Sequence, residues 1–473
     1  MLTTNGGTIV DNLDIFDLKA VQIKKTKAYL IQAGEDRQQQ IDSVQLGTYV
    51  PVHRNPVHAI QKTEANMIKE LLPLRHERMM KSPFAFFRGT AELMEKDLKH
   101  QHQSNIPIIL CGDAHVQNFG FYASPERQLL FGLNDFDEAR IGNWESDLKR
   151  LLVSVQLAGE ENGFTDDELR HPLKKVTKTY RHAIKRANKD SLLQQYYFSF
   201  KYSDMIATIQ RLDHHNTPKS IHHVMNKILQ KIQHSNSTQI VNKMAEKGAD
   251  GEYHFIENAP RAKHLSDHRY QEIVAGFNKY RQNVRPDIQV FLANFHISDI
   301  IQYSVGVGSF GTRCYLILLT GNDGTNLVLQ IKEAMPLRYN LQALEVAQAI
   351  ANGQRAGRRI VTAQRILQSS SDPFLGPTSF AKRSYYIRQF RDMKESINVA
   401  KLDWESFSLY CETCVLLLAM AHYQSPSSSI IRGYLKHQKR LDDLFADWTI
   451  QYTQQVHRDY DTVLKYLKAK HEY

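Results

Sequence analysis

The chain has 473 residues, of which 42% are hydrophobic and 23% charged, and its formal net charge is +10. This composition is that of a globular protein and excludes an intrinsically disordered or collagen-like chain. No apolar run approaches the roughly 20 residues that a membrane-spanning helix needs. At this length we expect two or three lobes, each able to bury a core.

The positive charge favours acidic partners, such as a nucleotide, a nucleic acid or an anionic lipid. Because the basic residues are spread along the chain without a dense block, we do not expect a nucleic-acid partner. The four cysteines are too few for a disulfide framework. Cys411 and Cys414 have metal-like spacing but no second pair, and we interpret them as core residues. No secretory signal is visible. We expect a cytoplasmic protein, with signal-independent export left open.

Residues 1–55 are weakly patterned and are interpreted as an N-terminal extension that packs on the main body. Residues 60–82 carry apolar side chains at helical spacing and predict a helix, which Pro73 interrupts. Ser82 and Pro83 then predict a new helix start, since serine caps helices and proline suits their first turn. Arg88 follows three aromatic residues. It is a candidate nucleotide-phosphate ligand, with the capping of a carboxylate as an equal alternative.

Two apolar runs between residues 108 and 133 predict short strands that end in polar side chains able to meet in space. These side chains are Asp113, His115, Asn118, Asp135 and Asp137. Phosphoryl-transfer enzymes use the same residue types. One aspartate takes the proton of the acceptor hydroxyl, while an asparagine and a second aspartate hold Mg²⁺. Asp113 and His115 are therefore the catalytic candidates, and Asn118, Asp135 and Asp137 the metal-ligand candidates.

Two alternatives remain for this cluster. Acids that follow strands are often only turn formers or helix caps. The Gly-Asp-x-His pattern also opens two-metal phosphoesterase sites, in which Asp113 and His115 would both bind metal. That second alternative expects further histidine and asparagine ligands at later strand ends, and no such series is visible in the sequence.

The next segment predicts a loop after Asp137 and then a helix that carries Asp147 in its first turn, where a negative charge suits the helix dipole. Helices are expected to dominate from there to about residue 245. Thr165 and Glu168 have the spacing of a capping box. Residues 236–265 contain two glycines and a proline and predict a loop or an insertion.

Residues 296–332 predict three strands joined by a glycine-rich turn and by a Gly-Asn-Asp-Gly hairpin turn at 321–324. The glycine-rich turn contributes Gly306, Gly308 and Gly311. A dinucleotide site would place a helix directly after such glycines. Here they lie within a β-ribbon, as in the kinase loop that covers nucleotide phosphates.

Lys332 ends the third strand and is a candidate for pairing with the α- and β-phosphates of ATP. Glu345, on a predicted helix, is its candidate ion-pair partner, with Glu333 or a solvated Glu345 as alternatives. Residues 384–394 predict one more strand that runs into a turn. In a kinase layout this segment, with Gln389, is where adenine binds the backbone at the lobe junction. Residues 405–422 predict an apolar helix.

The order of these segments is inverted relative to ordinary kinases, because the catalytic-loop candidates precede the glycine loop, the lysine and the lobe junction. Spatial assembly rather than chain order builds a site, so a circularly permuted chain can still form one.

Five runs of this sequence resemble a large bacterial family known as domain of unknown function 2252. The runs are 74–89, 111–120, 133–138, 305–315 and 386–394, and the resemblance brings no established activity. The Gly-Asp-x-His-x-x-x-Asn core and the later Asp-Phe pair also resemble aminoglycoside- and choline-type phosphotransferases of the kinase-like fold. That resemblance implies that Asp113 is the base, that Asn118 and Asp135 bind Mg²⁺, and that Asp147 has a structural role.

The sequence departs from those phosphotransferases at three positions. Cys111 stands where they usually have histidine. Asp137 stands where many have glycine, which leaves open whether Asp135 or Asp137 binds metal. Arg313 follows the glycines at a position that is usually valine, next to the expected adenine site.

These observations predict an α+β, two-lobed, kinase-like fold in permuted order. The expected parts are the extension 1–55, a helical lobe 56–295, a nucleotide-binding β lobe 296–395, and C-terminal helices 396–473 that pack back on the helical lobe. The expected activity is transfer of phosphate from ATP, with Mg²⁺ or Mn²⁺, to a hydroxyl of an unidentified small molecule or protein. The alternatives are a nucleotide-binding pseudokinase scaffold, AMP transfer and a metal-dependent phosphoesterase.

Overall fold

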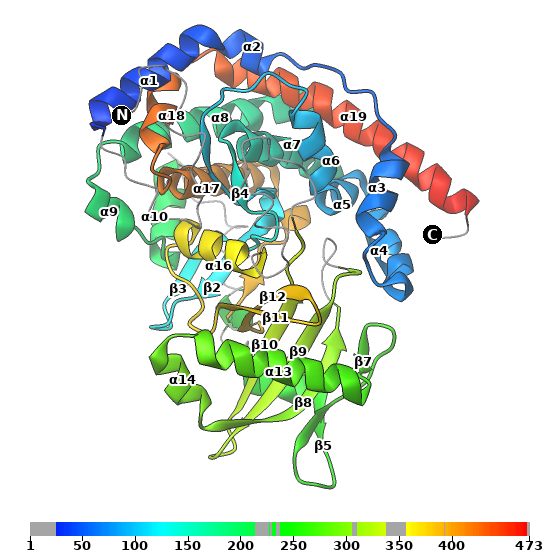
Figure 1. Ribbon diagram of the computed structural model, residues 1–473. Helices are drawn as coiled ribbons and strands as arrows, with labels where there is room; N and C mark the ends of the chain where they lie inside the picture. The colour runs from blue at the N-terminus through cyan, green and yellow to red at the C-terminus, as the bar shows by residue number, and fades with distance from the viewer. Residues whose placement is uncertain are drawn as a thin grey trace, which may run out of the picture.

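The structure is a computed structural model, and it describes residues 25–212, 227, 229–232, 237–304, 310–336, 356–391 and 393–470. It is a mixed α+β protein with a helix-rich part and a sheet-rich part, separated by small sheets and one helix (Figure 1). None of the described helices is long and apolar enough to cross a membrane.

Segments from the two ends of the chain pack against each other across the top of the helix-rich part (Figure 1). The N-terminal segment forms α1 (Lys27–Gln40) and α2 (Ser43–Gly47), and the C-terminal segment forms α18 (Ser428–Tyr434) and α19 (Leu441–Ala469). Helices α1 and α18 touch at Gly34 and Gly433, where an added Cβ on Gly433 would lie 1.9 Å from the Ile31 carbonyl oxygen. The described part of the N-terminal extension therefore packs on the main body, as expected.

The segment 60–82, expected to be helical with an interruption at Pro73, is broken earlier in the structure, after Glu64. It contains α3 (Pro56–Glu64), the 3₁₀ turn η2 (Lys69–Leu71) and α4 (Leu72–Met79), followed by α5 (Pro83–Gly89) and α6 (Ala91–Leu98). The break has a tertiary cause, because the amide of Ile68 donates to the Gly311 carbonyl at 2.8 Å in the other part of the molecule. Ser82 caps α5 through the amide of Ala85, as predicted.

The core of the helix-rich part is built around α7 (Glu145–Glu161), α8 (Asp166–Ala187) and α17 (Trp404–Tyr423). Two short helices, α9 (Leu192–Tyr196) and α10 (Tyr202–Leu212), follow α8. Thr165 and Glu168 form the predicted capping box at the start of α8. Cys411 and Cys414 are free and fully buried in α17, which confirms their interpretation as core residues.

Two small antiparallel sheets line the side of the helical core that faces the sheet-rich part. In the first, β1 (Pro107–Leu110) pairs with β4 (Arg140–Asn143). In the second, the strand order is β13-β2-β3, formed by β13 (Glu395–Ser396), β2 (Phe119–Ala123) and β3 (Leu129–Leu133). The 3₁₀ turn η3 (Val116–Asn118) joins β1 to β2, and η4 (Val399–Lys401) follows β13.

The sheet-rich part holds a six-stranded antiparallel sheet of order β11-β12-β10-β9-β8-β7. Its strands are β7 (Ala262–His264), β8 (Phe295–Tyr303), β9 (Cys314–Gly321), β10 (Asn326–Glu333), β11 (Gly376–Phe380) and β12 (Arg383–Gln389). The predicted hairpin turn joins β9 to β10, with Gly324 at a φ of +82° that favours glycine. Helix α16 (Ala356–Leu367) lies between the sheet and the helical core.

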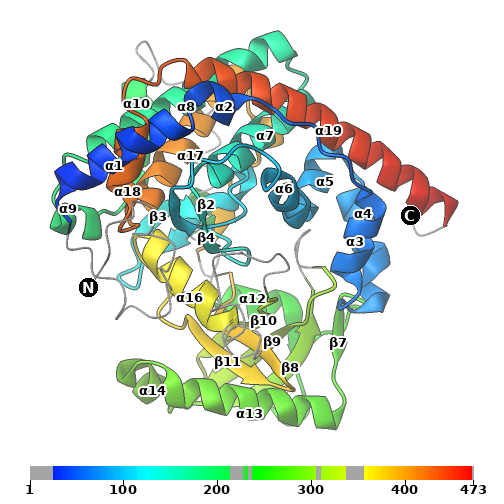
Figure 2. The same cartoon turned by 45° about the horizontal axis from the view of Figure 1, so that its top comes forward.

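The predicted boundary at residue 295/296 is wrong, because residues 237–295 belong with the sheet. They form α12 (Ser237–Met244), the hairpin β5 (Ala245–Lys247) with β6 (Tyr253–Phe255), strand β7, α13 (Asp267–Asn283) and α14 (Pro286–Leu292). Helix α13 covers the outer face of the sheet, and α12 packs on the opposite face (Figure 2). The apolar stripes of these helices are buried only against the sheet. The sequence predicts a loop or an insertion at 236–265, and the loop alternative is wrong because the segment contains α12, β5, β6 and β7.

Candidate active site

A tight loop after β1 presents Asp113 to the space between the two parts. The loop turns at Gly112, where φ is +82° and an added Cβ would lie 1.9 Å from the Glu138 carbonyl oxygen, so only glycine fits. Asp147, in the first turn of α7, accepts hydrogen bonds from the amides of Cys111 at 2.9 Å and Gly112 at 3.1 Å. This is a structural role of the kind that the resemblance implies for Asp147.

The Asp147 carboxylate is itself held by His422 of α17, whose Nε2 lies 3.3 Å away. Burial alone would raise the pKa of Asp147, but the hydrogen bond and the charge of His422 lower it. The ionised carboxylate therefore fastens the β1 loop, α7 and α17 together.

Asp113 is held by one arginine and lies beside one histidine. Its Oδ1 accepts from Arg150 Nε at 2.8 Å, and Arg150 also donates to the Phe87 carbonyl at 2.7 Å. Its Oδ2 lies 3.7 Å from His115 Nε2. Burial raises the pKa of Asp113, and the Arg150 charge offsets part of that increase. A carboxylate with a raised pKa is a better proton acceptor than an exposed one.

His115 is a neutral neighbour of this carboxylate. Burial, followed by the charges of Arg88 and Arg150, holds the pKa of His115 well below its usual range. Its Nδ1 is buried without a hydrogen-bond partner in the part of the chain that the structure describes.

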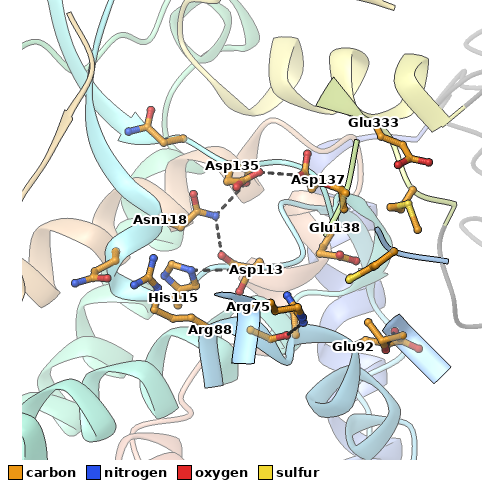
Figure 3. Close-up of a pocket in the computed structure, with 18 of the residues that line it drawn as sticks. Arg75, Arg88, Glu92, Asp113, His115, Asn118, Asp135, Asp137, Glu138 and Glu333 are labelled. Carbon is orange, nitrogen blue, oxygen red and sulfur yellow. Dashed lines mark hydrogen bonds and ion pairs between the residues drawn. The ribbon is translucent and has the colours of Figure 1, made fainter. Parts of the chain in front are cut away.

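Asn118 joins the first acidic loop to the second. Its Nδ2 donates to the Asp113 carbonyl at 2.7 Å and to the Asp135 carbonyl at 3.0 Å (Figure 3). Because both donor positions of the amide are used, the orientation of the side chain is fixed. Its Oδ1 is buried and has no hydrogen-bond partner among the described residues.

Asp135 and Asp137 differ in how closely other side chains pair with their carboxylates. The Asp137 carboxylate forms an ion pair with Lys332 and accepts from the Tyr386 hydroxyl at 2.8 Å. The Asp135 side chain is 50% exposed, and its Oδ2 lies 3.8 Å from Lys332 Nζ. Burial opposes ionisation of Asp135, but the charges of Lys332, Arg388 and Lys394 hold its pKa at about 2. The Asp135 carboxylate is thus ionised and remains accessible.

Lys332 brings the six-stranded sheet to the acidic loops. It stands near the end of β10 with a side chain that is 6% exposed. The structure therefore places Lys332 beside acidic loops that lie almost two hundred positions earlier in the sequence. Burial opposes the charge on Lys332, but Asp135 and Asp137 raise its pKa well above the usual value.

The alternative pairing of Lys332 with Glu333 is not formed. Glu333 instead accepts from Arg383 Nη1 at 2.7 Å and from the amide of Arg313 at 3.0 Å. Glu345, Gly306 and Gly308 lie outside the described residues.

The remaining predicted nucleotide ligands have structural partners of their own. Gly311 has a φ of +93°, and an added Cβ would lie 2.8 Å from the sulfur of Met67. Gln389 ends β12, and its amide donates to the Asp372 carboxylate. The backbone donor expected to meet adenine at this position is therefore already used.

Two cavities meet at the acidic cluster. A cavity of about 1020 Å³ is lined by Lys332, Gln330, Arg388 and Gln389 among others. A second cavity of about 260 Å³ is lined by Asp113, His115, Asn118, Asp137 and Arg88, among others. Both cavities share Asn134, Asp135, Lys394 and Ser396. Arg88, predicted as a nucleotide ligand, lines only the smaller cavity.

Several site residues carry no pattern that sequence reasoning could use. Arg150 lies three residues after Asp147 on the same helix face, and that spacing is the one available signal. Tyr386, Arg388 and Lys394 belong to the predicted strand and turn at 384–394, but nothing there shows which side chains face the acids. Burial and the charge of Arg388 lower the pKa of Lys394 to about 7.

The donor set suits a hard cation that keeps other ligands. Within the described ranges, no group of three or more His, Cys, Asp or Glu side chains is placed to hold a metal ion. Mg²⁺, however, is commonly bound by one or two carboxylates together with substrate phosphates and water. The unpartnered Oδ1 of Asn118 and the ionised carboxylate of Asp135 fit that kind of site.

Residues 67–466 match the family described as "Uncharacterized protein conserved in bacteria" (DUF2252). No curated protein and no solved structure matches the chain. The match spans most of the sequence and includes both acidic loops, Lys332 and the β12 segment. The chain therefore belongs to the DUF2252 family.

Proposed function

We propose that this chain is an ATP-dependent phosphotransferase with a kinase-like fold in circularly permuted order. The observation that carries the proposal is the meeting of Lys332 with Asp135 and Asp137 at a point where two cavities join. One cavity has the size and the charge for a nucleotide, and the other holds a buried carboxylate that can accept a proton.

The arrangement of the described elements supports the fold half of the proposal. The ribbon β8–β9, the lysine strand β10, helix α16 and strand β12 follow in the order of a kinase small lobe. The chain then crosses at residues 390–394 to β13 and α17. The acidic loops, which come earlier in the sequence, stand where a kinase chain would continue after α17.

The larger cavity is the proposed nucleotide site. Lys332 and Arg388 place positive charge along it, which suits a triphosphate. The smaller cavity is the proposed acceptor site, because Asp113 lies in it. Asp135 is part of both walls, so a phosphate that leaves one cavity enters the other beside this residue.

In the proposed reaction an acceptor oxygen forms a bond to the γ-phosphorus of ATP. The bond from that phosphorus to the β–γ bridging oxygen breaks, and ADP leaves with this oxygen. The hydroxyl proton moves to the Asp113 carboxylate and is later released to solvent, so the products are a phosphate ester, ADP and a proton. Arg150 keeps Asp113 oriented, and this pairing also favours the base role over metal binding.

Asn118 and Asp135 would hold Mg²⁺ or Mn²⁺, which supplies charge neutralisation to the phosphates when bound. Asp137 is a weaker candidate for this role, because Lys332 and Tyr386 already engage its carboxylate. Arg359 steadies the same loop by donating to the Asp137 carbonyl at 2.9 Å.

The test is incubation of the full chain with Mg²⁺ and ATP labelled at the α- or the γ-phosphate, with pools of hydroxyl compounds and proteins as acceptors. We expect γ-label in the product together with ADP. Asp113→Asn should lower this turnover by at least about a hundredfold, while ATP still raises the melting temperature. Asp167→Asn, at an exposed first-turn position of α8, is the matched control and should be unaffected.

Other products would identify other functions. Transfer of the α-label means AMP transfer, and stabilisation by ATP without turnover means a nucleotide-binding scaffold. Phosphate release from esters without ATP, unaffected by Lys332→Met, means a phosphoesterase. Each of these results would replace the proposed phosphotransferase activity.

A further inference from the structure

Arg88 is a largely buried cation without a counter-ion of its own. In the described part of the chain its guanidinium forms no ion pair, its Nε is buried without a hydrogen-bond partner, and its nearest ring contact is Phe84 at 5.9 Å. Burial lowers the pKa of Arg88, and the carboxylates of Asp113 and Glu161 do not offset this effect. An arginine in such a position is stabilised by an anion that arrives from outside.

The two arginines nearest to it in the site are already paired. Arg150 donates to the Asp113 carboxylate at 2.8 Å. Arg75 donates to Glu64 at 3.0 Å and to the Gly89 carbonyl at 2.9 Å. These two have structural partners, whereas Arg88 differs in having its charge available to a ligand.

The position of Arg88 points to the acceptor rather than to the nucleotide. It lines the smaller cavity and not the larger one. In Figure 3, Asp135 and Asn118 lie above Asp113, His115 lies beside it, and Arg88 lies below. Arg88 also feels the charge of Asp113 more strongly than that of Asp135. On the nucleotide side, Lys332 and Arg388 already supply positive charge.

We infer that the acceptor is a compact hydroxyl compound that carries an anionic group, a carboxylate or a phosphate, and that Arg88 binds this group. The inference rests on the proposed function for the statement that a hydroxyl reacts at Asp113. The cavity of about 260 Å³ is smaller than the ~300–1,000 Å³ of pockets for drug-sized ligands, so a small metabolite fits.

The experiment measures binding by isothermal titration calorimetry to the full chain without nucleotide. The probes are D-glycerate, glycerol 3-phosphate, glycerol and choline, which separate a carboxylate, a phosphate, a neutral hydroxyl compound and a cation. We expect one or both anions to bind at least about tenfold more tightly than glycerol or choline. Loss of a hydrogen-bonded charge pair weakens binding by roughly 10- to 100-fold, so Arg88→Gln should have that effect on the anions alone.

Two further variants serve as controls. Arg88→Lys keeps the charge without the planar fork and should give an intermediate affinity. Arg186→Gln makes the same substitution at an exposed position of α8 and should bind all probes as the natural chain does. Melting temperatures with Mg²⁺ and ATP show whether each variant is folded and retains its nucleotide site.

Three results would overturn the inference. The first is binding of the anions no tighter than that of glycerol, and the second is an unchanged affinity for them in Arg88→Gln. The third is weaker ATP binding in Arg88→Gln while the anions bind as before. The last result would assign Arg88 to the transferred phosphate. Because no nucleotide is present in the calorimetry, Arg88-dependent anion binding supports the inference even if the labelled-ATP assay shows no transfer.

Discussion

At the scale of single residues, the site is organised by charges that the protein does not fully neutralise. Asp135 stays ionised because three cations surround it, and Asp137 is held by Lys332 and Tyr386. Lys394 shows the opposite effect, because burial and neighbouring cations lower its pKa to about 7. A group that titrates near neutral pH beside the proposed phosphate path has a measurable consequence.

We predict that binding of ATP with Mg²⁺ at about pH 8 takes up a proton at Lys394. In the folded protein without ligand this lysine is mostly neutral above pH 7, and the phosphate charge raises its pKa. The expected uptake is a measurable fraction of a proton, determined by calorimetry in buffers with different ionisation enthalpies. Lys394→Met should bring the uptake close to zero. An unchanged uptake in that variant would place the proton elsewhere.

The prediction for Lys332 is also local. Lys332→Met removes the only described cation that lies within ion-pair distance of both Asp135 and Asp137. We expect the apparent affinity for ATP with Mg²⁺ to fall by at least about tenfold. A thermal-shift titration measures this affinity. Lys279→Met, on the outer helix α13, is the control. Normal nucleotide binding by Lys332→Met contradicts the assignment of the larger cavity.

At the scale of elements, Asp147 is the joint between the β1 loop, α7 and α17. Asp147→Asn removes the buried negative charge that hydrogen-bonds to His422 and to two backbone amides. We expect a loss of about 3 kcal/mol in the free energy of unfolding, in line with the cost of disrupting a buried charged hydrogen bond. Asp267→Asn, an exposed first-turn position of α13, should change stability by less than about 1 kcal/mol. Urea denaturation of both variants measures the difference.

The same elements show how far the sequence could be read. Local residue patterns correctly predicted helix starts and turns that a few neighbouring residues determine. Examples are the Thr165 capping box, the Ser82 cap and the 321–324 hairpin turn. Such patterns failed for residues 237–295, because an apolar helix stripe does not say which surface will cover it. They also placed the interruption of the 60–82 helix at Pro73 rather than after Glu64, since the hydrogen bond from Ile68 to Gly311 is a contact between distant segments.

For the site, residue types and spacing predicted the acidic loops and Lys332, which the structure brings together. The partners that hold them could not be predicted, because Arg150, Tyr386 and Arg359 lie in segments whose facing is set by tertiary packing. Asp372 is a further case. Its carboxylate accepts the hydrogen bond of the Gln389 amide, and no sequence pattern links the two positions.

At the scale of the whole molecule, helices from the two ends of the chain close over the helical core. The contact between α1 and α18 requires glycine at position 433, because an added Cβ would lie 1.9 Å from the Ile31 carbonyl oxygen. We predict that Gly433→Ala lowers the free energy of unfolding by roughly 1–3 kcal/mol. Gly132→Ala adds a Cβ at an ordinary 3.5 Å from Tyr122 and serves as the control. Equal melting temperatures for the two variants would contradict the close contact.

Asp135 forms part of the wall of both cavities, and this has a thermodynamic consequence. A ligand bound in either cavity changes the electrostatic potential at a ligand bound in the other. Such coupling is reciprocal, so the factor by which one ligand alters the affinity of the other is the same in both directions. Compounds designed for one cavity should therefore be screened with the other cavity occupied, since their affinity depends on which ligand that other cavity holds.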